Sequence, residues 1–554
     1  MTLRHHALLS SLTDILTLFI NLTAFDILNN PEGIIMLMSA ADYRDSLRAY
    51  KPRVFVSGQA VESVADEPLL APGIAGVGVT YDFALQEQHA RIMTARQGTS
   101  GKTVNRMLHI NETSQDLLDK LEAVRLVCRT SGCAQRYLTH DALNGLWQAT
   151  HLIDANHGTD YGQRFLAYLH DIQDRDLTLG VAMTDAKGDR SLRPGKQVNP
   201  DVYVHITERR KDGIVIRGTK AIVTGAPYMH EFLVMPCRTH MPEDSAFAVC
   251  CAVPCDAPGV TIISRPAGQP GNAAAKFSAK YGQAVAMVVF DDVFVPHDRV
   301  FLAGETEEGG FLTTSYATHH RHSCIAARAG FGDLLIGAGA LMIEANGLDA
   351  DRHGHIRDQM VELITITESF YACGVASSVY CTKDAAGSVM PDAVFSNIGK
   401  LLLATKIYDM HRVAHYVSGG LIVALPGPDE DHNPETAASI AAVMGGRADI
   451  PFEQRVEVAR FIEDLTVSHE AGWYSVISLH GGGSPEAMKR EIWRNYPVME
   501  KVELVESLLD RGLLNDGRRV SKQPGRCCTI GCETPELTPP SGTAASSLAM
   551  ERSV

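Results

Sequence analysis

The first residues that could do chemistry form a polar loop after a short apolar run, Ala182-Met183-Thr184-Asp185-Ala186-Lys187-Gly188-Asp189-Arg190. This loop combines a hydroxyl group, charges of both signs and a glycine. Such groups can hydrogen-bond the ring or the pyrophosphate of a flavin through charge-assisted contacts. An ordinary polar surface loop has the same composition, and composition alone favours that interpretation. The candidate cofactor-binding residues of the loop are Thr184, Lys187, Gly188, Asp189 and Arg190.

Two further segments offer a hydroxyl group and exposed backbone. Thr224 and Gly225 end an alternating apolar run, where they could approach a flat ring, although such a pair more often forms a turn. His480 is followed by three glycines and then by Ser-Pro, directly before the helical sequence EAMKREIW. Free backbone N–H groups at a helix start suit a pyrophosphate; a flexible linker is the alternative. The candidates are Thr224, Gly225, Gly482, Gly483, Ser484 and Pro485.

Cysteines and histidines gather in two places, Cys128-x4-Cys133 and His319-His320-Arg321-His322-Ser323-Cys324. These residue types bind metals and iron–sulfur clusters, but neither segment has a standard zinc or ferredoxin spacing. Cysteines buried on helices are more often small core residues than ligands. The histidines could still place a general acid or base near a redox cofactor.

Several common catalytic motifs are absent from the sequence. It has no G-x-G-x-x-G after an early strand, no P-loop, no G-x-S-x-G and no H-E-x-x-H. Rossmann-type NAD binding, nucleotide hydrolysis and triad hydrolysis therefore lack support.

The elements that must position these residues change character twice along the chain. Residues 36–180 have apolar residues at helical spacing, starting with a Ser-capped helix in MLMSAADYRDSLRAY. Residues 181–300 alternate with period two and contain a hairpin signal at Lys211-Asp212-Gly213, which predicts a compact β-barrel or sandwich. Residues 301–520 contain four or so long helical segments, one of them FEQRVEVARFIEDLTVSHEAGWYS, and these predict a bundle. The expected fold class is α+β, with an N-terminal α domain, a middle β domain and a C-terminal helical bundle.

The two ends of the chain differ from this pattern. Residues 1–35 form an extension that need not belong to the fold, and residues 521–554, rich in Pro, Ser and Thr, are typical of a disordered tail. The apolar run 7–28 contains Asp14 and Asp26, and a charge at mid-span costs about 2.5–3.5 kcal/mol on insertion scales. We therefore predict neither a transmembrane helix nor a signal peptide.

Composition limits the partners and the compartment. The 554 residues carry a formal charge of -15, from 65 acidic and 50 basic side chains, which would repel nucleic acid. Twelve cysteines without the dense spacing of a disulfide framework suit a reducing compartment, so we expect a cytoplasmic protein.

Six motifs, in order along the chain, resemble one known family: MLMSAADYRDSLR, AMTDAKGDR, GIVIRGTKAIVTGAP, VVFDDVFVPHDRVF, YATHHRHS and LHGGGSP. The family is that of 4-hydroxyphenylacetate 3-hydroxylase and 4-hydroxybutyryl-CoA dehydratase, with the dehydratase branch closer, and the resemblance runs from about Met36 to residue 515. It implies an acyl-CoA dehydrogenase-like fold, with FAD between the β domain and the C-terminal helices, in a homo-oligomer that is usually a tetramer. It also implies that residues 187–190 and Thr224 contact FAD and that residues 482–485 form a flavin-binding turn.

The resemblance breaks down at the positions that hold an iron–sulfur cluster. In the dehydratase, three cysteines and one histidine bind a [4Fe-4S] cluster. Cys133 and His320 match two of these positions, whereas Tyr137 and Ala327 occupy the other two. We therefore expect no metal; if a cluster were present, Cys133 and His320 would be its ligands.

Both known substrate sites are also altered. Cys324 and Ile477 stand at the positions of the dehydratase's catalytic tyrosine and glutamate. Leu138 and Ala142 replace the hydroxylase's phenol-binding arginine and tyrosine, and Val181 replaces its active-site histidine. The flavin site is retained, but the substrate is not identified.

Three functions remain open after these comparisons of motifs. The first is an FAD-dependent monooxygenase acting on an aromatic or polyketide-like small molecule, with reduced flavin supplied by a separate reductase because the chain has no NAD-binding motif. The second is a lyase or isomerase like 4-hydroxybutyryl-CoA dehydratase/vinylacetyl-CoA isomerase, and the third is a non-catalytic flavoprotein. For an enzyme, His320 is the predicted acid or base, and Arg190 and Thr224 position the flavin. We expect a homodimer or homotetramer that binds neither nucleic acid nor a membrane.

Overall fold

The structure is a computed structural model that describes residues 37–509. The predictions for residues 1–35 and 521–554 concern residues outside this range. The chain divides into two compact units after Tyr496. Helix α15 (Val498–Leu508) belongs to the second unit, and all other described helices and strands belong to the first.

The first part of the chain is helical, as predicted. Ser39 caps the first helix: its Oγ accepts a hydrogen bond from the backbone N–H of Asp42, and the Asp42 carboxylate accepts one from the backbone N–H of Ser39. Thr113 and Asp116 form the same capping box at α5. The helices of this part are α2 (Ala40–Leu47), α3 (Ala71–Leu85), α4 (Glu87–Met93), α5 (Ser114–Ser131), α6 (Tyr137–His157) and α7 (Tyr161–Asp174).

Short strands interrupt this helical part, and the spacing of apolar residues in the sequence did not predict them. Strand β1 (Val54–Val56) pairs in parallel with β11 of the middle sheet and antiparallel with β2 (Gln59–Ala60). Strands β3 (Thr94–Arg96) and β4 (Thr103–Asn105) form a small hairpin. The first helical segment is therefore joined to the β domain by backbone hydrogen bonds.

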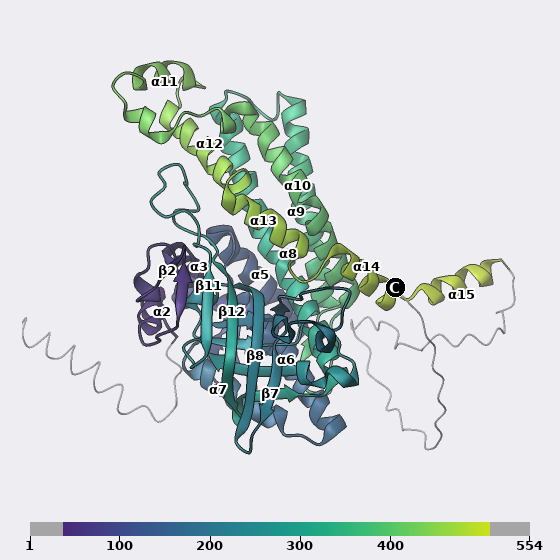
Figure 1. Ribbon diagram of the computed structural model, residues 1–554. Helices are drawn as coiled ribbons and strands as arrows, with labels where there is room; N and C mark the ends of the chain where they lie inside the picture. Colours follow the sequence, from purple (N-terminus) through teal and green to yellow (C-terminus); the bar gives the residue numbers. More distant parts are fainter. Residues whose placement is uncertain (1–36, 510–554) are drawn as a thin grey trace, which may run out of the picture. The chain divides into compact units, whose positions relative to one another are not determined.

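The middle of the chain forms two sheets. The larger one has seven strands in the order β2-β1-β11-β12-β8-β6, with β7 also paired to β8, and β11, β12, β8 and β7 lie side by side in Figure 1. The smaller one has the order β13-β10-β9-β5. The antiparallel pair of β7 and β8 confirms the predicted hairpin. The strands are β5 (Leu179–Ala182), β6 (Thr184–Asp185), β7 (His205–Arg209), β8 (Gly213–Thr224), β9 (Glu231–Val234), β10 (Val249–Pro254), β11 (Val260–Ser264), β12 (Val285–Pro296) and β13 (Val300–Ala303).

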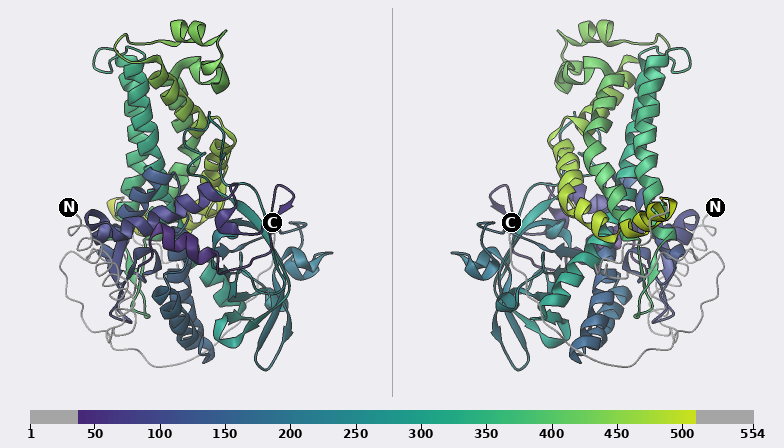
Figure 2. Two further views of the ribbon diagram at one scale, coloured as in Figure 1. Left: turned by 90° about the vertical axis from the view of Figure 1, so that its left-hand side faces the viewer. Right: turned by 90° about the vertical axis from the view of Figure 1, so that its right-hand side faces the viewer.

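The last part is a bundle of long helices, as predicted. Helices α8, α9 and α10 run together in the views of Figures 1 and 2, and α8 also packs against α5 and α6. The helices are α8 (Thr306–Ala345), α9 (Gly354–Val379), α10 (Ala393–Ser418), α11 (Ala437–Met444), α12 (Phe452–Thr466), α13 (His469–His480) and α14 (Pro485–Asn495), and a two-stranded hairpin of β14 (Thr382–Lys383) and β15 (Val389–Met390) precedes α10.

Two features of the bundle differ from simple expectation. The segment from Phe452 to Ser475 is two helices rather than one, because Ser468 accepts hydrogen bonds from the backbone N–H groups of Glu470 and Ala471 and so begins α13. Helix α8 is long and apolar enough to cross a membrane, but 61% of its most apolar window is buried inside the protein. Core helices of soluble proteins have the same properties.

A buried ion pair ties the polar loop to the middle of β8. The Nζ atom of Lys220 lies 2.8 Å from Oδ1 of Asp185, and both side chains are almost fully buried. Lys220 also donates to the carbonyl oxygens of Met183 and Met235, at 3.0 Å and 2.8 Å. Asp185 accepts from the backbone N–H of Val204. Every part of this pair has hydrogen-bonding partners, which is the condition for burying charge without a large penalty.

We predict that Lys220→Met destabilises the protein by about 3–5 kcal/mol, because it leaves the Asp185 carboxylate buried without its partner. The measurement is chemical denaturation followed by far-UV circular dichroism. Arg217→Met on the same strand is the control: Arg217 pairs with Asp292 in an exposed position, so this variant should lose no more than about 1 kcal/mol. Equal losses in both variants would show that burial of the Lys220 pair has no special role.

Candidate functional site

A cavity of about 730 Å³ lies where β5, β8, α8, α10, α13 and α14 meet. Segments that are far apart in the sequence supply its lining. The predicted site residues that line it are Thr184, Lys187, Arg190, Thr224, His320, Gly482, Gly483 and Ser484, together with Cys133. Gly188, Asp189, Gly225 and Pro485 adjoin these residues in the chain without lining the cavity. The polar loop, the end of β8 and the glycine turn thus share one cavity, and their role in binding a cofactor stays a prediction.

The polar loop is held in an unusual backbone conformation. Lys187 has φ 72° and Gly188 has φ 50°, and the backbone N–H of Lys187 donates to the carbonyl oxygen of Val202 at 3.1 Å. Asp189 uses its carboxylate within the loop, where it accepts from the backbone N–H and the hydroxyl group of Ser191. Lys187 and Arg190 are therefore the charged ends of the loop that face the cavity.

The glycine turn needs glycine at Gly482, which has φ 74°. A Cβ atom there would lie 3.2 Å from Cδ2 of His320, so the turn packs directly against that ring. The Nε of Arg321 donates to the carbonyl oxygen of Gly482 at 2.9 Å and fixes the turn to α8. Ser484 then caps α14, accepting from the backbone N–H of Ala487. The turn thus brings a helix N-terminus, with its partial positive charge, to the cavity wall.

His320 occupies a fixed position beside two tyrosine rings. Its ring is stacked on Tyr316, with centroids 5.3 Å apart and an angle of 8°, and on Tyr137, with 6.1 Å and 18°. Its Nδ1 lies 3.1 Å from Oδ2 of Asp141, and its Nε2 lies 3.4 Å from Sγ of Cys324. Both ring nitrogens are therefore committed to named partners, and the ring plane cannot turn freely.

Asp141 is a fully buried carboxylate surrounded by donors. The hydroxyl group of Ser323 donates to its Oδ1 at 2.6 Å, and Nζ of Lys120 lies 3.6 Å from the same oxygen. Burial alone would raise the pKa of Asp141, but the Lys120 charge and the hydrogen bonds from His140 and His320 hold the pKa well below its usual value. The carboxylate is therefore ionised at neutral pH.

The same charges set the state of His320 and of the neighbouring thiols. Burial alone would lower the pKa of His320, but the negative charges of Cys324 and Asp141 raise it to about 10. Burial would raise the pKa of Cys324, yet the charge and the hydrogen bond of His320 lower it. The hydrogen bond from Cys128 lowers the pKa of Cys133 to about 6. His320 is thus an imidazolium at neutral pH, suited to donate a proton rather than to accept one.

Two more cations line the inner part of the cavity. Arg328 donates from Nε to the hydroxyl group of Ser478 at 2.5 Å, and its Nη1 is buried without a hydrogen-bond partner among residues 37–509. Lys400 donates from Nζ to the carbonyl oxygen of Ser478 at 2.5 Å, and burial lowers its pKa to about 8. These groups favour a negatively charged or strongly polar atom in the cavity.

The side chains at the cluster positions do not form a cluster site. Tyr137 places its hydroxyl group 3.4 Å from Sγ of Cys133, and Ala327 offers no ligand atom. Within the part of the chain that the structure describes, no group of three or more His, Cys, Asp or Glu side chains is placed to hold a metal ion. A [4Fe-4S] cluster with four protein ligands therefore does not fit this cavity.

Several groups that the structure places at the site were not predicted from the sequence. Asp141, Tyr316, Arg328 and Lys400 were not among the candidates, although Asp141 contacts His320 and the other three line the cavity. The available signal was a charged residue on a helical face that is otherwise apolar. Asp141, Arg328 and Lys400 all have this property, and buried charge needs a partner or a function.

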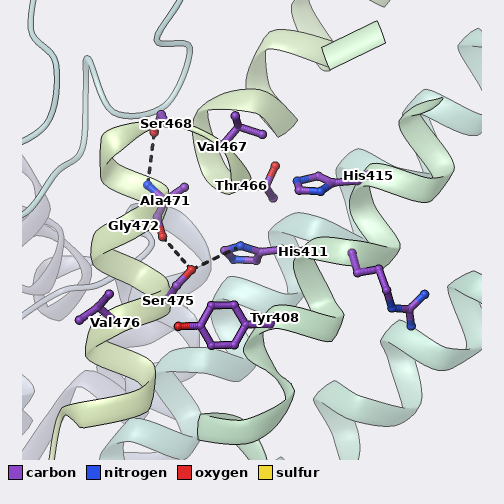
Figure 3. A pocket seen from close by; sticks show the side chains of 11 residues that line it. Tyr408, His411, His415, Thr466, Val467, Ser468, Ala471, Gly472, Ser475 and Val476 are labelled. Atoms are coloured by element: carbon purple, nitrogen blue, oxygen red, sulfur yellow. Dashed lines mark hydrogen bonds between the residues drawn. The ribbon is translucent and has the colours of Figure 1, made fainter. Parts of the chain in front are cut away.

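A second, more open hollow of about 530 Å³ lies between α10 and the α12–α13 junction (Figure 3). His411 and His415 stand one turn apart on α10, and Nδ1 of His411 lies 3.5 Å from the hydroxyl group of Ser475. None of the predicted cofactor-binding residues lines this hollow.

Another buried carboxyl group lies at the start of α13, whose later turns line the cavity. Glu470 is 3% exposed, and its Oε1 has no hydrogen-bond partner among residues 37–509. Burial raises its pKa to about 8, and the nearby charge of Asp464 adds to this effect. The group therefore holds a proton in the folded protein at neutral pH.

Comparison with known proteins gives a consistent result over most of the chain. Residues 39–302 match the family model described as 4-hydroxyphenylacetate 3-hydroxylase N terminal, and residues 310–510 match its C-terminal counterpart. The 4-hydroxybutyryl-CoA dehydratase/vinylacetyl-CoA-Δ-isomerase of Clostridium aminobutyricum is 35% identical, over 85% of this chain and 99% of its own. The oxygenase component of 4-hydroxyphenylacetate 3-monooxygenase from Thermus thermophilus is 23% identical, over 86% and 98%.

Solved structures confirm the predicted acyl-CoA dehydrogenase-like fold. An oxygen-tolerant archaeal 4-hydroxybutyryl-CoA dehydratase from N. maritimus superposes with a TM-score of 0.83 at 33% identity, covering 89% of this chain and 97% of its own. An oxygenase component of 4-hydroxyphenylacetate 3-monooxygenase, complexed with FAD and 4-hydroxyphenylacetate, superposes with a TM-score of 0.77 at 21% identity, covering 85% and 98%.

We predict that Glu470→Gln makes stability less dependent on pH. Between about pH 5 and pH 8 the folded protein keeps the Glu470 proton while the unfolded chain has lost it, so stability falls as pH rises. Glutamine removes this dependence. Melting temperatures at about pH 5.5 and pH 8.5 should therefore differ less in the variant than in the wild type. Glu453→Gln, at an exposed position on α12, is the control and should behave as the wild type; an unchanged pH dependence in Glu470→Gln would contradict the prediction.

Proposed function

Because this chain belongs to the 4-hydroxyphenylacetate 3-hydroxylase family, we propose that it is an FAD-dependent oxidoreductase that works without an iron–sulfur cluster. One observation carries this proposal: three separate flavin-site segments line a single cavity, in which the cluster ligand set is incomplete. The flavin, when bound, would supply the redox chemistry.

The lining residues offer the charges and hydrogen-bonding groups that a flavin dinucleotide requires. Lys187 and Arg190 supply positive charge from the polar loop, and Gly482, Gly483 and the start of α14 offer backbone next to a helix N-terminus. These groups would hold the diphosphate. Thr224, at the end of β8, has its hydroxyl group on the same cavity and would hydrogen-bond the ring.

Within this family, we propose monooxygenation of an aromatic or polyketide-like small molecule as the first candidate reaction. The support is the incomplete cluster ligand set, which removes the basis for cluster-dependent dehydration. The absence of a Rossmann-type motif means that a separate reductase would supply reduced flavin. In this reaction His320, held as an imidazolium beside Tyr137 and Tyr316, would donate a proton to the substrate.

A specific observation favours a second candidate, a lyase or double-bond isomerase. The chain is more similar to a 4-hydroxybutyryl-CoA dehydratase/vinylacetyl-CoA-Δ-isomerase, at 35% identity, than to the oxygenase component from Thermus thermophilus, at 23%. Isomerisation moves a proton between two carbon atoms, and the pair of Cys324 thiolate and charged His320 offers a base to take it and an acid to return it.

The proposed enzyme is a homodimer or homotetramer. Large apolar side chains support this: Tyr408 and Tyr416 of α10 and Val476 of α13 are about half exposed. Tyr408 and Val476 border the hollow of Figure 3. Apolar patches of this kind are typical of subunit interfaces.

We predict that protein purified without oxygen shows the absorption spectrum of bound flavin. It should contain less than about one iron atom per four chains, whereas a [4Fe-4S] cluster in each chain would bring four iron atoms per chain. Anaerobic protein should then be tested in two assays: oxygen consumption with reduced FAD and phenolic compounds, and isomerisation of vinylacetyl-CoA. Hydroxylated product supports the first candidate, and isomerisation alone supports the second. Colourless protein that takes up no FAD, or stoichiometric iron with labile sulfide, would overturn the proposal.

We further predict that Gly482→Ala weakens FAD binding by about tenfold. A non-glycine residue in the left-handed region costs roughly 1–2 kcal/mol, and the added Cβ would press on His320, so the turn would move away from its present position. Binding is measured by fluorescence titration of apoprotein. Gly472→Ala on α13, where a Cβ would meet no atom within 4 Å, is the matched control and should bind FAD as the wild type does. Unchanged affinity in Gly482→Ala would exclude this turn from the flavin site.

A further inference from the structure

Cys324, His320 and Asp141 are connected in a line. Sγ of Cys324 lies 3.4 Å from Nε2 of His320, and Nδ1 of the same ring lies 3.1 Å from Oδ2 of Asp141. Cys324 and His320 are one turn apart on α8, whereas Asp141 comes from α6. A thiol, an imidazole and a carboxylate in this order form the arrangement that activates a nucleophile.

The surroundings fix the geometry of this line. The rings of Tyr137 and Tyr316 lie nearly parallel to the His320 ring, and Ser323 and Lys120 hold the carboxylate of Asp141. A catalytic group gains most when its rotamer is locked in this way, because no ordering is required during the reaction.

The thiol can be reached, and a cation lies close to it. Cys324 is 9% exposed and lines the 730 Å³ cavity. Arg328 lines the same cavity, its charge stabilises the thiolate of Cys324, and its Nη1 is buried without a hydrogen-bond partner among residues 37–509. Such an N–H group can donate a hydrogen bond to a carbonyl oxygen on which negative charge develops.

We propose that Cys324 is a catalytic nucleophile that adds covalently to an α,β-unsaturated carbonyl compound in the cavity, with His320 as its proton carrier and Asp141 as a positioning residue. The proton of the Cys324 thiol is already held by His320, so the reaction begins from a thiolate–imidazolium pair. The sulfur then forms a bond with the β-carbon, and the electron pair of the C=C bond moves toward the carbonyl oxygen, held by Arg328. The imidazolium returns the proton to the α-carbon, and the product is a thioether. Reversal of these steps releases the unsaturated compound, so neither an oxidant nor a reductant is needed.

This addition goes beyond the proposed function and does not depend on it. No electron passes to or from a flavin in the thiol addition, so the reaction can be tested whether or not FAD is bound. A failed flavin assay therefore leaves the addition testable, and a failed addition leaves the flavin proposal intact.

The test uses acrylamide, a small conjugated amide, on the purified full-length protein at about pH 6.5, where an ordinary thiol is almost fully protonated. Labelled cysteines are identified by peptide mass spectrometry over time. Cys324 should react at least about tenfold faster than Cys237, which lines the same cavity but whose pKa is raised by burial. Faster labelling of Cys133, the other thiol on this cavity with a lowered pKa, would overturn the assignment.

Matched variants separate the relay from general reactivity. Cys324→Ser should abolish the fast phase, and Cys237→Ser should leave it unchanged. His320→Asn should slow labelling of Cys324 by about tenfold or more, whereas His297→Asn, at an exposed histidine outside the cavity, should not. Circular dichroism shows whether each variant is folded; if His320→Asn is not, His320→Gln takes its place. An unchanged rate in a folded His320 variant would overturn the proposal.

Discussion

One buried carboxylate holds the site together. Asp141 on α6 meets Lys120 on α5 and both His320 and Ser323 on α8. The interaction thus joins two helices of the first part of the chain to the central helix of the bundle. Breaking such a buried, fully paired charge costs several kcal/mol, so these three helices have little freedom to move separately. The position of His320, and of everything that packs on it, follows from this constraint.

Periodicity in the sequence was sufficient for the order of the three parts and for the hairpin at residues 211–213, because long helices and alternating strands leave strong patterns. It missed β1, whose three residues are too few to show alternation and whose pairing with β11 is a contact across more than 200 residues. It also treated α12 and α13 as one helix, because apolar residues continue at helical spacing on both sides of Ser468. Only the serine cap separates the two helices. A tertiary partner therefore decides the first feature and a local helix cap decides the second.

Only part of the site could be predicted from the sequence, again because some residues matter through the partners that they meet in the fold. Glycine and charged residues that interrupt apolar sequence, such as Gly482 and Lys187, are visible without a structure. Asp141 is not, because its importance comes from the partners that it meets across α5 and α8. The similarity to the dehydratase also coexists with a changed set of side chains: a tyrosine hydroxyl group now lies beside Cys133 at a position where the family's cluster would need a thiolate. Overall likeness and local chemistry are therefore separate questions for this chain.

The sequence separation of the Asp141 contacts has a consequence for biosynthesis. Lys120 emerges from the ribosome shortly before Asp141, but His320 follows 179 residues later. During translation Asp141 can pair with Lys120 before His320 has been synthesised. Helices α5 and α6 can therefore pack together early, held by this ion pair. His320 and Cys324 both lie on α8, so their contacts with Asp141 and with each other join the site only after α8 has been synthesised and has packed against α6.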